Sequence, residues 1–101
     1  MKTFGIDFDG TYAAEVDTFR AVVDLLQQAG HQCIIVTNRP QAESAQVARV
    51  VAGQMPIICT GGRPKRQAAI DAGYRVAIWV DDMPVLVDFG EAGLIMTGDR
   101  Y

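Results

Sequence analysis

Short apolar runs rich in β-branched residues alternate along this chain with longer stretches in which apolar residues recur every three or four positions. The first pattern is typical of buried strands and the second of amphipathic helices, so together they predict βαβ units. The expected strands span residues 3–8, 32–36, 56–59, 75–80 and 93–97, and the expected helices span 16–30, 40–51 and 64–72, with a short helical turn from residue 84. Because short connections between such elements make the strands parallel, we predict an α/β fold with a three-layer, Rossmann-like open sheet that is mostly parallel.

Length and composition indicate one globular domain, residues 1–101. No repeat, low-complexity tract or linker interrupts the pattern, and 50% of the residues are hydrophobic and 21% charged, as in soluble globular proteins. The net charge of −3 argues against a broad electrostatic grip on nucleic acid but leaves room for a local basic patch. The apolar run at the amino terminus is too short for a signal peptide or a membrane span, so we expect a cytoplasmic protein that does not bind membranes.

Polar residues follow the expected strands at the point where each strand ends. They are Asp7 with Asp9, Thr37 with Asn38, Lys65, and Asp81 with Asp82. Taken singly, these residues have plain structural roles as helix caps, turn residues or solvated side chains. Taken together, they favour a site, because the carboxyl ends of parallel strands share one edge of a sheet and would bring them to a single crevice around one phosphate group.

The pair Asp7 and Asp9 has the chemistry that phosphoryl transfer needs. In an extended segment residues two apart point to the same side, so both carboxylates are expected to face the crevice while Phe8 packs inward. An ionised Asp7 could attack phosphorus and form an aspartyl phosphate, while Asp9 gives a proton to the leaving oxygen and later takes one from water. Two like charges close together raise one of the two pKa values, which favours such a division of roles. Gly10 permits a sharp turn after the strand.

A cation is expected among these carboxylates, because several negative charges at one edge would otherwise repel one another. Oxygen ligands suit Mg²⁺, and Asp81 and Asp82 supply ligands in addition to Asp7 and Asp9. The sequence therefore predicts a magnesium site.

Two further residues are expected to stabilise the charge of a phosphate group. Lys65 near a helix amino terminus adds positive potential, and the hydroxyl of Thr37 can donate a hydrogen bond to a phosphate oxygen. A Walker A loop is excluded, because Gly61 and Gly62 precede Lys65 without the GxxxxGK spacing.

These residues resemble the motifs of the haloacid dehalogenase-like (HAD-like) superfamily. Its first motif is a strand ending in Asp-x-Asp-Gly-Thr, matched by residues 7–11, and its second is a Thr or Ser that ends the next strand, matched by Thr37. The third is a Lys, matched by Lys65, and the acidic fourth motif is matched by Asp81 and Asp82. The resemblance spans roughly residues 3–82 and follows the same motif order.

The resemblance implies a role for each of these residues. Asp7 would be the nucleophile and Asp9 the acid/base, as in the phosphatases of the superfamily and unlike its dehalogenases and ATPases. Mg²⁺ would be held by the Asp7 carboxylate, the Asp9 main-chain carbonyl, Asp81 and, directly or through water, Asp82. Contacts with the substrate are expected from residues that follow the catalytic positions in the chain, namely Gly10, Thr11, Asn38 and Arg39.

Neither of the usual positions for a cap domain is occupied in this sequence. Only a helix fits between Thr11 and the second expected strand, and only a helix and a strand fit between Thr37 and Lys65. The interval 12–14 is also too short for the hairpin flap that members of the superfamily normally carry. The resemblance therefore implies a HAD-like core with an open site, which suits a large substrate that covers it or a homodimer in which the partner acts as a lid.

The sequence thus predicts a magnesium-dependent phosphomonoester hydrolase. Its substrate would be a phosphorylated small molecule or an exposed phosphate on a macromolecule. Arg39, Arg63 and Arg66 lie near the same edge and could hold a second anionic part of the substrate, such as a nucleotide or polynucleotide phosphate, or be solvated residues at helix ends. The alternative is a catalytically weak module that binds phosphate and metal or serves regulation. A response-regulator receiver is disfavoured, because its motif residues come in another order.

Overall fold

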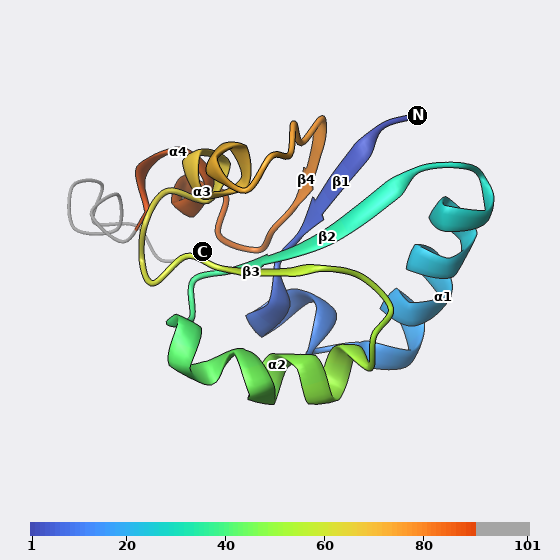
Figure 1. The fold of residues 1–101 in the computed structure, drawn as a ribbon. Helices are drawn as coiled ribbons and strands as arrows, with labels where there is room; N and C mark the ends of the chain where they lie inside the picture. The colour runs from blue at the N-terminus through green and yellow to red at the C-terminus, as the bar shows by residue number, and fades with distance from the viewer. Residues whose placement is uncertain (91–101) are drawn as a thin grey trace.

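The computed structural model describes residues 1–90 of the chain as an α/β fold with one parallel sheet (Figure 1). In the described residues the sheet has four strands in the order β3-β2-β1-β4, and all neighbouring pairs are parallel. The strands are β1 (Thr3–Ile6), β2 (Gln32–Thr37), β3 (Ile57–Cys59) and β4 (Ile78–Val80). The helices are α1 (Val16–Gln28), α2 (Ser44–Val51), α3 (Lys65–Asp71) and α4 (Val85–Phe89), and two turns, η1 (Phe8–Tyr12) and η2 (Gln41–Glu43), precede α1 and α2. The predicted α/β class with parallel strands is confirmed, and the strand expected at 93–97 lies outside the described residues.

The central strand β2 explains why helices cover both faces of the sheet. Cys33 and Ile35 join the core that includes residues of α1 and α2, whereas Ile34 and Val36 pack with Ala69 of α3. Successive residues of a strand point to opposite faces, so an apolar run of this kind requires cover on both sides. Figure 1 shows α1 and α2 on one side of the sheet and α3 and α4 on the other.

The two faces are packed unequally. The cluster on the α1 and α2 face includes Val23 and Val47, which are fully buried. The cluster on the α3 face contains a smaller set of buried residues, and Ile70 of α3 remains 51% exposed. Because α3 has only seven residues, it leaves part of this face open.

Strand β1 ends at Ile6 and not at Phe8 as expected. The carbonyl of Asp7 accepts a hydrogen bond from the Tyr12 N–H, and the carbonyl of Phe8 accepts one from the Ala13 N–H. These two bonds close the turn η1, so the chain leaves the sheet directly after Asp7.

Strand β4 begins at Ile78, three residues later than expected. In the β1–β4 register Phe4 pairs with Ile78. One residue earlier in each strand, the Ala77 N–H donates a hydrogen bond to the carbonyl of Thr3. Because β1 begins at Thr3, residues 75 and 76 have no partner in β1. They form a connection between α3 and β4.

The helices lie close to their expected positions. After α1 and α3, Gly30 and Gly73 adopt positive φ angles of 90° and 94°. In both cases the glycine N–H and the next N–H donate back into the last turn, which is a Schellman motif. The expected helix from residue 40 starts with η2 before α2, and the helical turn expected after Pro84 is α4. None of the helices within residues 1–90 combines the length and the apolar character that crossing a membrane requires.

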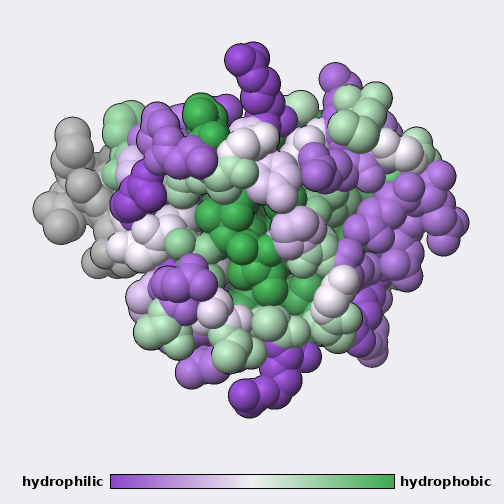
Figure 2. Space-filling view, viewed as in Figure 1, coloured by the Kyte–Doolittle hydropathy of each residue, from purple (hydrophilic) through white to green (hydrophobic). Residues whose placement is uncertain are grey.

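Strand β3 forms one edge of the sheet within the described residues. Each of its three residues is half-buried. Figure 2 shows an apolar area near the centre of this view, at the place that β3 has in Figure 1.

Candidate functional site

The carboxyl ends of β1, β2 and β4 come together at one edge of the sheet, as expected. Asp7 follows β1, and its N–H donates at 2.9 Å to the carbonyl of Val80, the last residue of β4. Asp81 and Asp82 come next in the chain, and Thr37 is the last residue of β2, the other neighbour of β1. Parallel pairing therefore brings residues from three strands to the same end of the sheet.

Lys65 is the buried cation at this edge. It is the first residue of α3, and its side chain is only 1% exposed. The Nζ atom lies 2.6 Å from Asp7 Oδ1 and 2.6 Å from Asp81 Oδ2. A buried ammonium is tolerated only with such partners, because an unpaired charge out of water is strongly destabilising.

Three carboxylates form a compact group around this contact. Oxygen atoms of Asp7, Asp81 and Asp82 lie within 4.8 Å of one another. The Thr11 hydroxyl donates to Asp7 Oδ2 at 3.1 Å, and the Met83 N–H donates to Asp81 Oδ1 at 2.9 Å. Two of the three side chains are thus held in place by the surrounding protein.

The donor set fits a hard divalent cation such as Mg²⁺, which takes one or a few carboxylates and keeps several waters. Gly10 is part of this fit. A Cβ added at Gly10 would lie 2.2 Å from Asp82 Oδ2, and the residue has a φ of +78°, so glycine leaves the space that Asp82 occupies. The Asp9 carboxylate, which was also expected to bind the metal, is not among these three.

A crevice of about 320 Å³, here called the acidic crevice, opens beside these carboxylates. The residues that line it are Asp7, Asp9, Gly10, Asn38, Asp82, Met83 and Leu86. Five of them are site residues predicted from the sequence, and two were not predicted. The two unexpected residues, Met83 and Leu86, belong to the turn into α4, and only the position of Pro84 signals that turn in the sequence. Thr37 is 1% exposed, and its hydroxyl oxygen accepts a hydrogen bond from the Arg39 N–H at 3.4 Å.

Burial raises the pKa of Asp7 from 3.8 to about 7, in spite of the opposing effect of the Lys65 charge. A hydrogen bond with Asp82 and the negative charge of Asp81 raise it further. In the protein alone Asp7 therefore holds a proton up to near neutrality. A divalent cation beside the three carboxylates would favour the ionised form.

Asp9 has a partner that the sequence analysis did not foresee. Asp7 and Asp9 both line the acidic crevice and Phe8 is buried, so the expected alternation is confirmed. The Asp9 carboxylate, however, accepts hydrogen bonds from Arg39 Nε and Nη2 at 2.9 and 2.8 Å. This pairing lowers the pKa of Asp9. The two pKa values are thus split in the sense opposite to that needed by an ionised nucleophile and a protonated acid.

Arg39 is itself held from several sides. Its Nη1 donates to Gln46 Oε1 at 3.0 Å and lies 3.5 Å from Glu43 Oε1. The guanidinium carbon lies 5.3 Å from the centre of the Phe8 ring. The predicted substrate contact therefore belongs to a network between η1 and the segment after β2, and no sequence pattern links Arg39 to a carboxylate thirty positions earlier.

Each of the three arginines that could hold a second anionic part of the substrate pairs with a different carboxylate. Arg39 pairs as described above, Arg63 pairs with Asp71, and Arg66 pairs with Asp88. Each guanidinium is already engaged by its own carboxylate.

Comparisons with known proteins assign no family to the chain. No family model matches it, and neither the curated proteins nor the solved structures gave a significant match. The functional conclusion therefore depends on the acidic crevice and its residues.

Proposed function

We propose that this chain is a magnesium-dependent phosphomonoester hydrolase with a HAD-like core and no cap, acting through an aspartyl phosphate on Asp7. The observation that carries the proposal is the buried contact of Lys65 with both Asp7 and Asp81, beside the third carboxylate of Asp82. Residues from the first, third and fourth motif positions thus touch one another. Lysine balances part of the negative charge, and a metal ion would balance the rest.

The reaction follows from the groups in and around the acidic crevice. In the first step an Asp7 oxygen bonds to phosphorus, the bond to the leaving oxygen breaks, and Asp9 passes a proton to that oxygen. In the second step Asp9 takes a proton from water, whose oxygen attacks phosphorus and breaks the bond to Asp7, releasing inorganic phosphate. Mg²⁺ held by Asp7, Asp81 and Asp82 would offset the negative charge of the phosphate group.

Arg39 supplies a way for the substrate to activate Asp9. In the resting protein its pairing with Asp9 holds the pKa of that carboxyl below its ordinary value, which leaves Asp9 without the proton that the first step needs. A phosphate group entering the acidic crevice offers the guanidinium a competing bidentate partner. Transfer of Arg39 to the substrate would raise the pKa of Asp9 and allow it to carry a proton.

The surroundings of the acidic crevice favour a substrate that covers it. Between η1 and β2 lies only α1, and between β2 and α3 lie only η2, α2 and β3. No inserted domain excludes water at these points, so the substrate itself would have to do so. We therefore favour a phosphate exposed on a large molecule. A second copy of the chain acting as a lid is the other arrangement, and sedimentation would reveal it.

A catalytically weak module that binds phosphate and metal is the second candidate. The observation that favours it is the bidentate pairing of Asp9 with Arg39, which keeps the acid/base ionised. If Arg39 does not move when phosphate binds, the protein would bind Mg²⁺ and beryllofluoride tightly without turnover.

Phosphate release from aryl phosphates in the presence of Mg²⁺ tests the proposal. We expect the wild type to be active, Asp7→Asn to fall to background, and EDTA to abolish the wild-type activity. The control is Asp17→Asn, because Asp17 is an exposed carboxylate on α1 that makes no side-chain hydrogen bond or ion pair within residues 1–90. It should retain full activity.

Two results would contradict the hydrolase proposal. One is a wild type without activity on any of a panel of aryl, sugar and polynucleotide phosphates. The other is an Asp7→Asn variant as active as Asp17→Asn. Tight binding of beryllofluoride together with the first result would support the weak module instead.

A further inference from the structure

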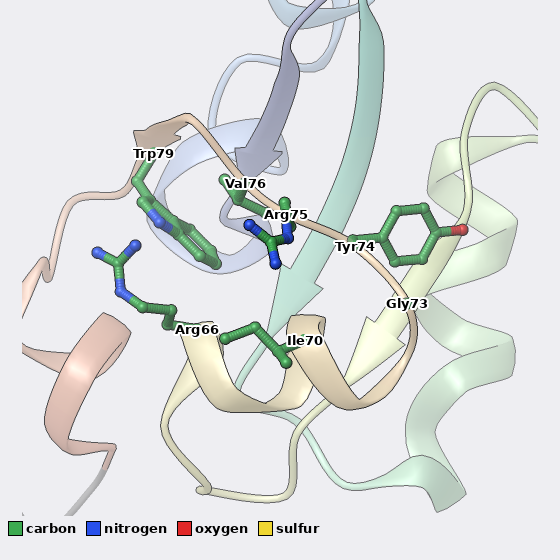
Figure 3. Close-up of a pocket in the computed structure, with 7 residues that line it drawn as sticks. All are labelled: Arg66, Ile70, Gly73, Tyr74, Arg75, Val76 and Trp79. Atoms are coloured by element: carbon green, nitrogen blue, oxygen red, sulfur yellow. The ribbon is translucent and has the colours of Figure 1, made fainter.

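A second pocket, here called the arginine pocket, lies on the α3 face of the sheet. Its volume is about 550 Å³, and none of its lining residues belongs to the acidic crevice. The lining residues come from α3, the following connection and β4, and include Arg66, Ile70, Tyr74, Arg75, Val76 and Trp79 (Figure 3). A pocket of this volume is large enough for an organic ligand of nucleotide size.

The apolar part of the pocket results from the incomplete cover of the sheet by α3. The Trp79 ring uses space that Gly5 of β1 leaves free, because a Cβ added at Gly5 would lie 2.8 Å from the ring. Val76 is close to the same position, and Ile70 lies on α3 across the pocket (Figure 3). Together these side chains form an aromatic and aliphatic surface against which a planar ring can pack.

The charge of the pocket is opposite to that of the chain. The chain has a net charge of −3, whereas the residues that line the pocket in the described part of the chain include two arginines and no carboxylate. Arg75 is exposed and makes no hydrogen bond or ion pair with any residue from 1 to 90. Figure 3 shows its guanidinium extending towards α3, between Trp79 and Tyr74. An unpaired guanidinium beside an apolar surface is a partner for an anionic group.

Arg66 lies at the other end of the pocket. Its guanidinium carbon is 5.8 Å from the centre of the Trp79 ring, and its Nε donates to Asp88 Oδ1 at 2.7 Å. The indole N–H of Trp79 is buried and has no acceptor within residues 1–90, and Figure 3 shows it on the side of the ring that faces Arg66. An unsatisfied buried donor is destabilising until an acceptor reaches it. The pocket thus places an unsatisfied donor beside one of its two arginines.

We propose that the arginine pocket binds a nucleoside monophosphate. The planar base packs against Trp79, Val76 and Ile70, and the phosphate pairs with Arg75. Both halves are needed, because the base alone leaves Arg75 unpaired and phosphate alone leaves the apolar surface uncovered. The site is independent of the proposed hydrolase function, since binding requires neither a metal ion nor any residue of the acidic crevice.

Fluorescence of Trp79 provides a direct test, because Trp79 is the single tryptophan of the chain. The full chain is titrated with AMP in the presence of EDTA, so that no metal-dependent binding contributes. We expect a saturable change in emission. Adenosine and inorganic phosphate should each bind at least about tenfold more weakly than AMP, because each lacks one half of the contacts.

Three variants assign the binding to this pocket. Arg75→Gln should weaken AMP binding about tenfold, because it removes a charge-assisted contact with phosphate. Asp88→Asn should strengthen binding about two- to fivefold, because it frees Arg66 from an exposed competing carboxylate. A gain in affinity cannot arise from misfolding. Arg49→Gln, which removes an exposed arginine of α2 on the other side of the sheet, should leave the affinity unchanged.

The proposal is overturned if AMP causes no saturable change, or if Arg75→Gln binds AMP as tightly as Arg49→Gln. It is also overturned if Asp7→Asn abolishes AMP binding, because the nucleotide would then occupy the acidic crevice. A protein without hydrolase activity that binds AMP in this Arg75-dependent way would contradict the proposed function and leave the arginine pocket supported.

Discussion

Lys65 and Arg66 are neighbours in the chain, yet the charge of Lys65 is buried among carboxylates while the charge of Arg66 remains in contact with water. The Lys65 side chain is 1% exposed and contacts carboxylates that are 8% and 2% exposed. The side chains of Arg66 and its partner Asp88 are 47% and 56% exposed. The first residue contacts Asp7, which lines the acidic crevice, and the second lines the arginine pocket.

The difference shows that burial decides how much an ion pair contributes to the protein. Lys65, Asp7 and Asp81 are out of water beside the acidic crevice, so each depends on its partners and the loss of one leaves the others uncompensated. In the arginine pocket water screens the charges, so a pair can break to admit a ligand at little cost. The first arrangement suits a fixed catalytic or metal site, and the second suits adaptable binding.

Lys65→Met should have the largest effect, because it leaves the buried carboxylates of Asp7 and Asp81 without their cation. We expect the free energy of unfolding to fall by about 3 kcal/mol or more. Arg66→Met should cost less than about 1 kcal/mol, since it breaks only an exposed pair. Urea denaturation in EDTA, above the pKa of Asp7, measures both. Equal losses would remove the distinction between the two regions.

The raised pKa of Asp7 predicts a pH dependence of stability in the absence of metal. Between 3.8 and about 7 the folded protein keeps a proton on Asp7 that the unfolded chain has lost. The stabilising contribution is therefore complete below the lower value and is lost as the pH rises through the upper one, at no more than about 1.4 kcal/mol per pH unit.

The variant Asp7→Asn should lose this component, while Asp17→Asn should keep it. Urea denaturation across this pH range in EDTA compares the two. If both variants show the same slope between the two pKa values, the component does not come from Asp7.

Gly10→Ala and Gly53→Ala separate backbone strain from contact with the metal ligands. Both glycines have positive φ angles, +78° and +76°, but only the Cβ at position 10 would meet a side chain, that of Asp82. We expect each variant to lose about 1 kcal/mol of stability. Only Gly10→Ala should weaken Mg²⁺ binding, by about tenfold, because Asp82 must move. Calorimetric titration with Mg²⁺ measures this, and equal affinities would exclude Asp82 from the metal site.

Arg39→Gln should have only a small effect on stability, within about 1 kcal/mol, because its pair with Asp9 is partly exposed. It should nevertheless raise the pKa of Asp9 towards the ordinary value, since the hydrogen bonds from Arg39 are the main cause of the lowering. Carboxyl NMR titration reports this pKa. Arg63→Gln is the matched control, because its partner is Asp71, and it should leave Asp9 unchanged. An unchanged Asp9 in Arg39→Gln would refute the proposed activation step.

The meeting of Asp7, Lys65 and Asp81 could be predicted because it follows from topology. Parallel strands joined by helices have their carboxyl ends at one edge, and each of these residues comes just after a strand or starts the helix that follows one. The pairing of Asp9 with Arg39 could not be predicted in this way. It depends on how η1 turns and on the course of the segment after β2, and neither has a periodicity that a sequence pattern reveals.

The true start of the strand expected at 75–80 could not be predicted from the sequence pattern either. The apolar alternation there is compatible with a full strand, but a strand needs a partner at each level and β1 begins only at Thr3. Residues 75 and 76 therefore form a connection, and Arg75 at the arginine pocket has no side-chain partner within residues 1–90.

The sequence by itself determined the α/β class, the parallel order of elements and the edge at which the acidic residues gather. These properties depend on periodicity and on short connections, which are local. Only the tertiary structure decided which charges are buried, so that Lys65 lies between two carboxylates while Arg66 stays in water. Burial depends on the packing of α3 against the sheet, which also sets the pKa of Asp7 and leaves the pocket beside Trp79 open.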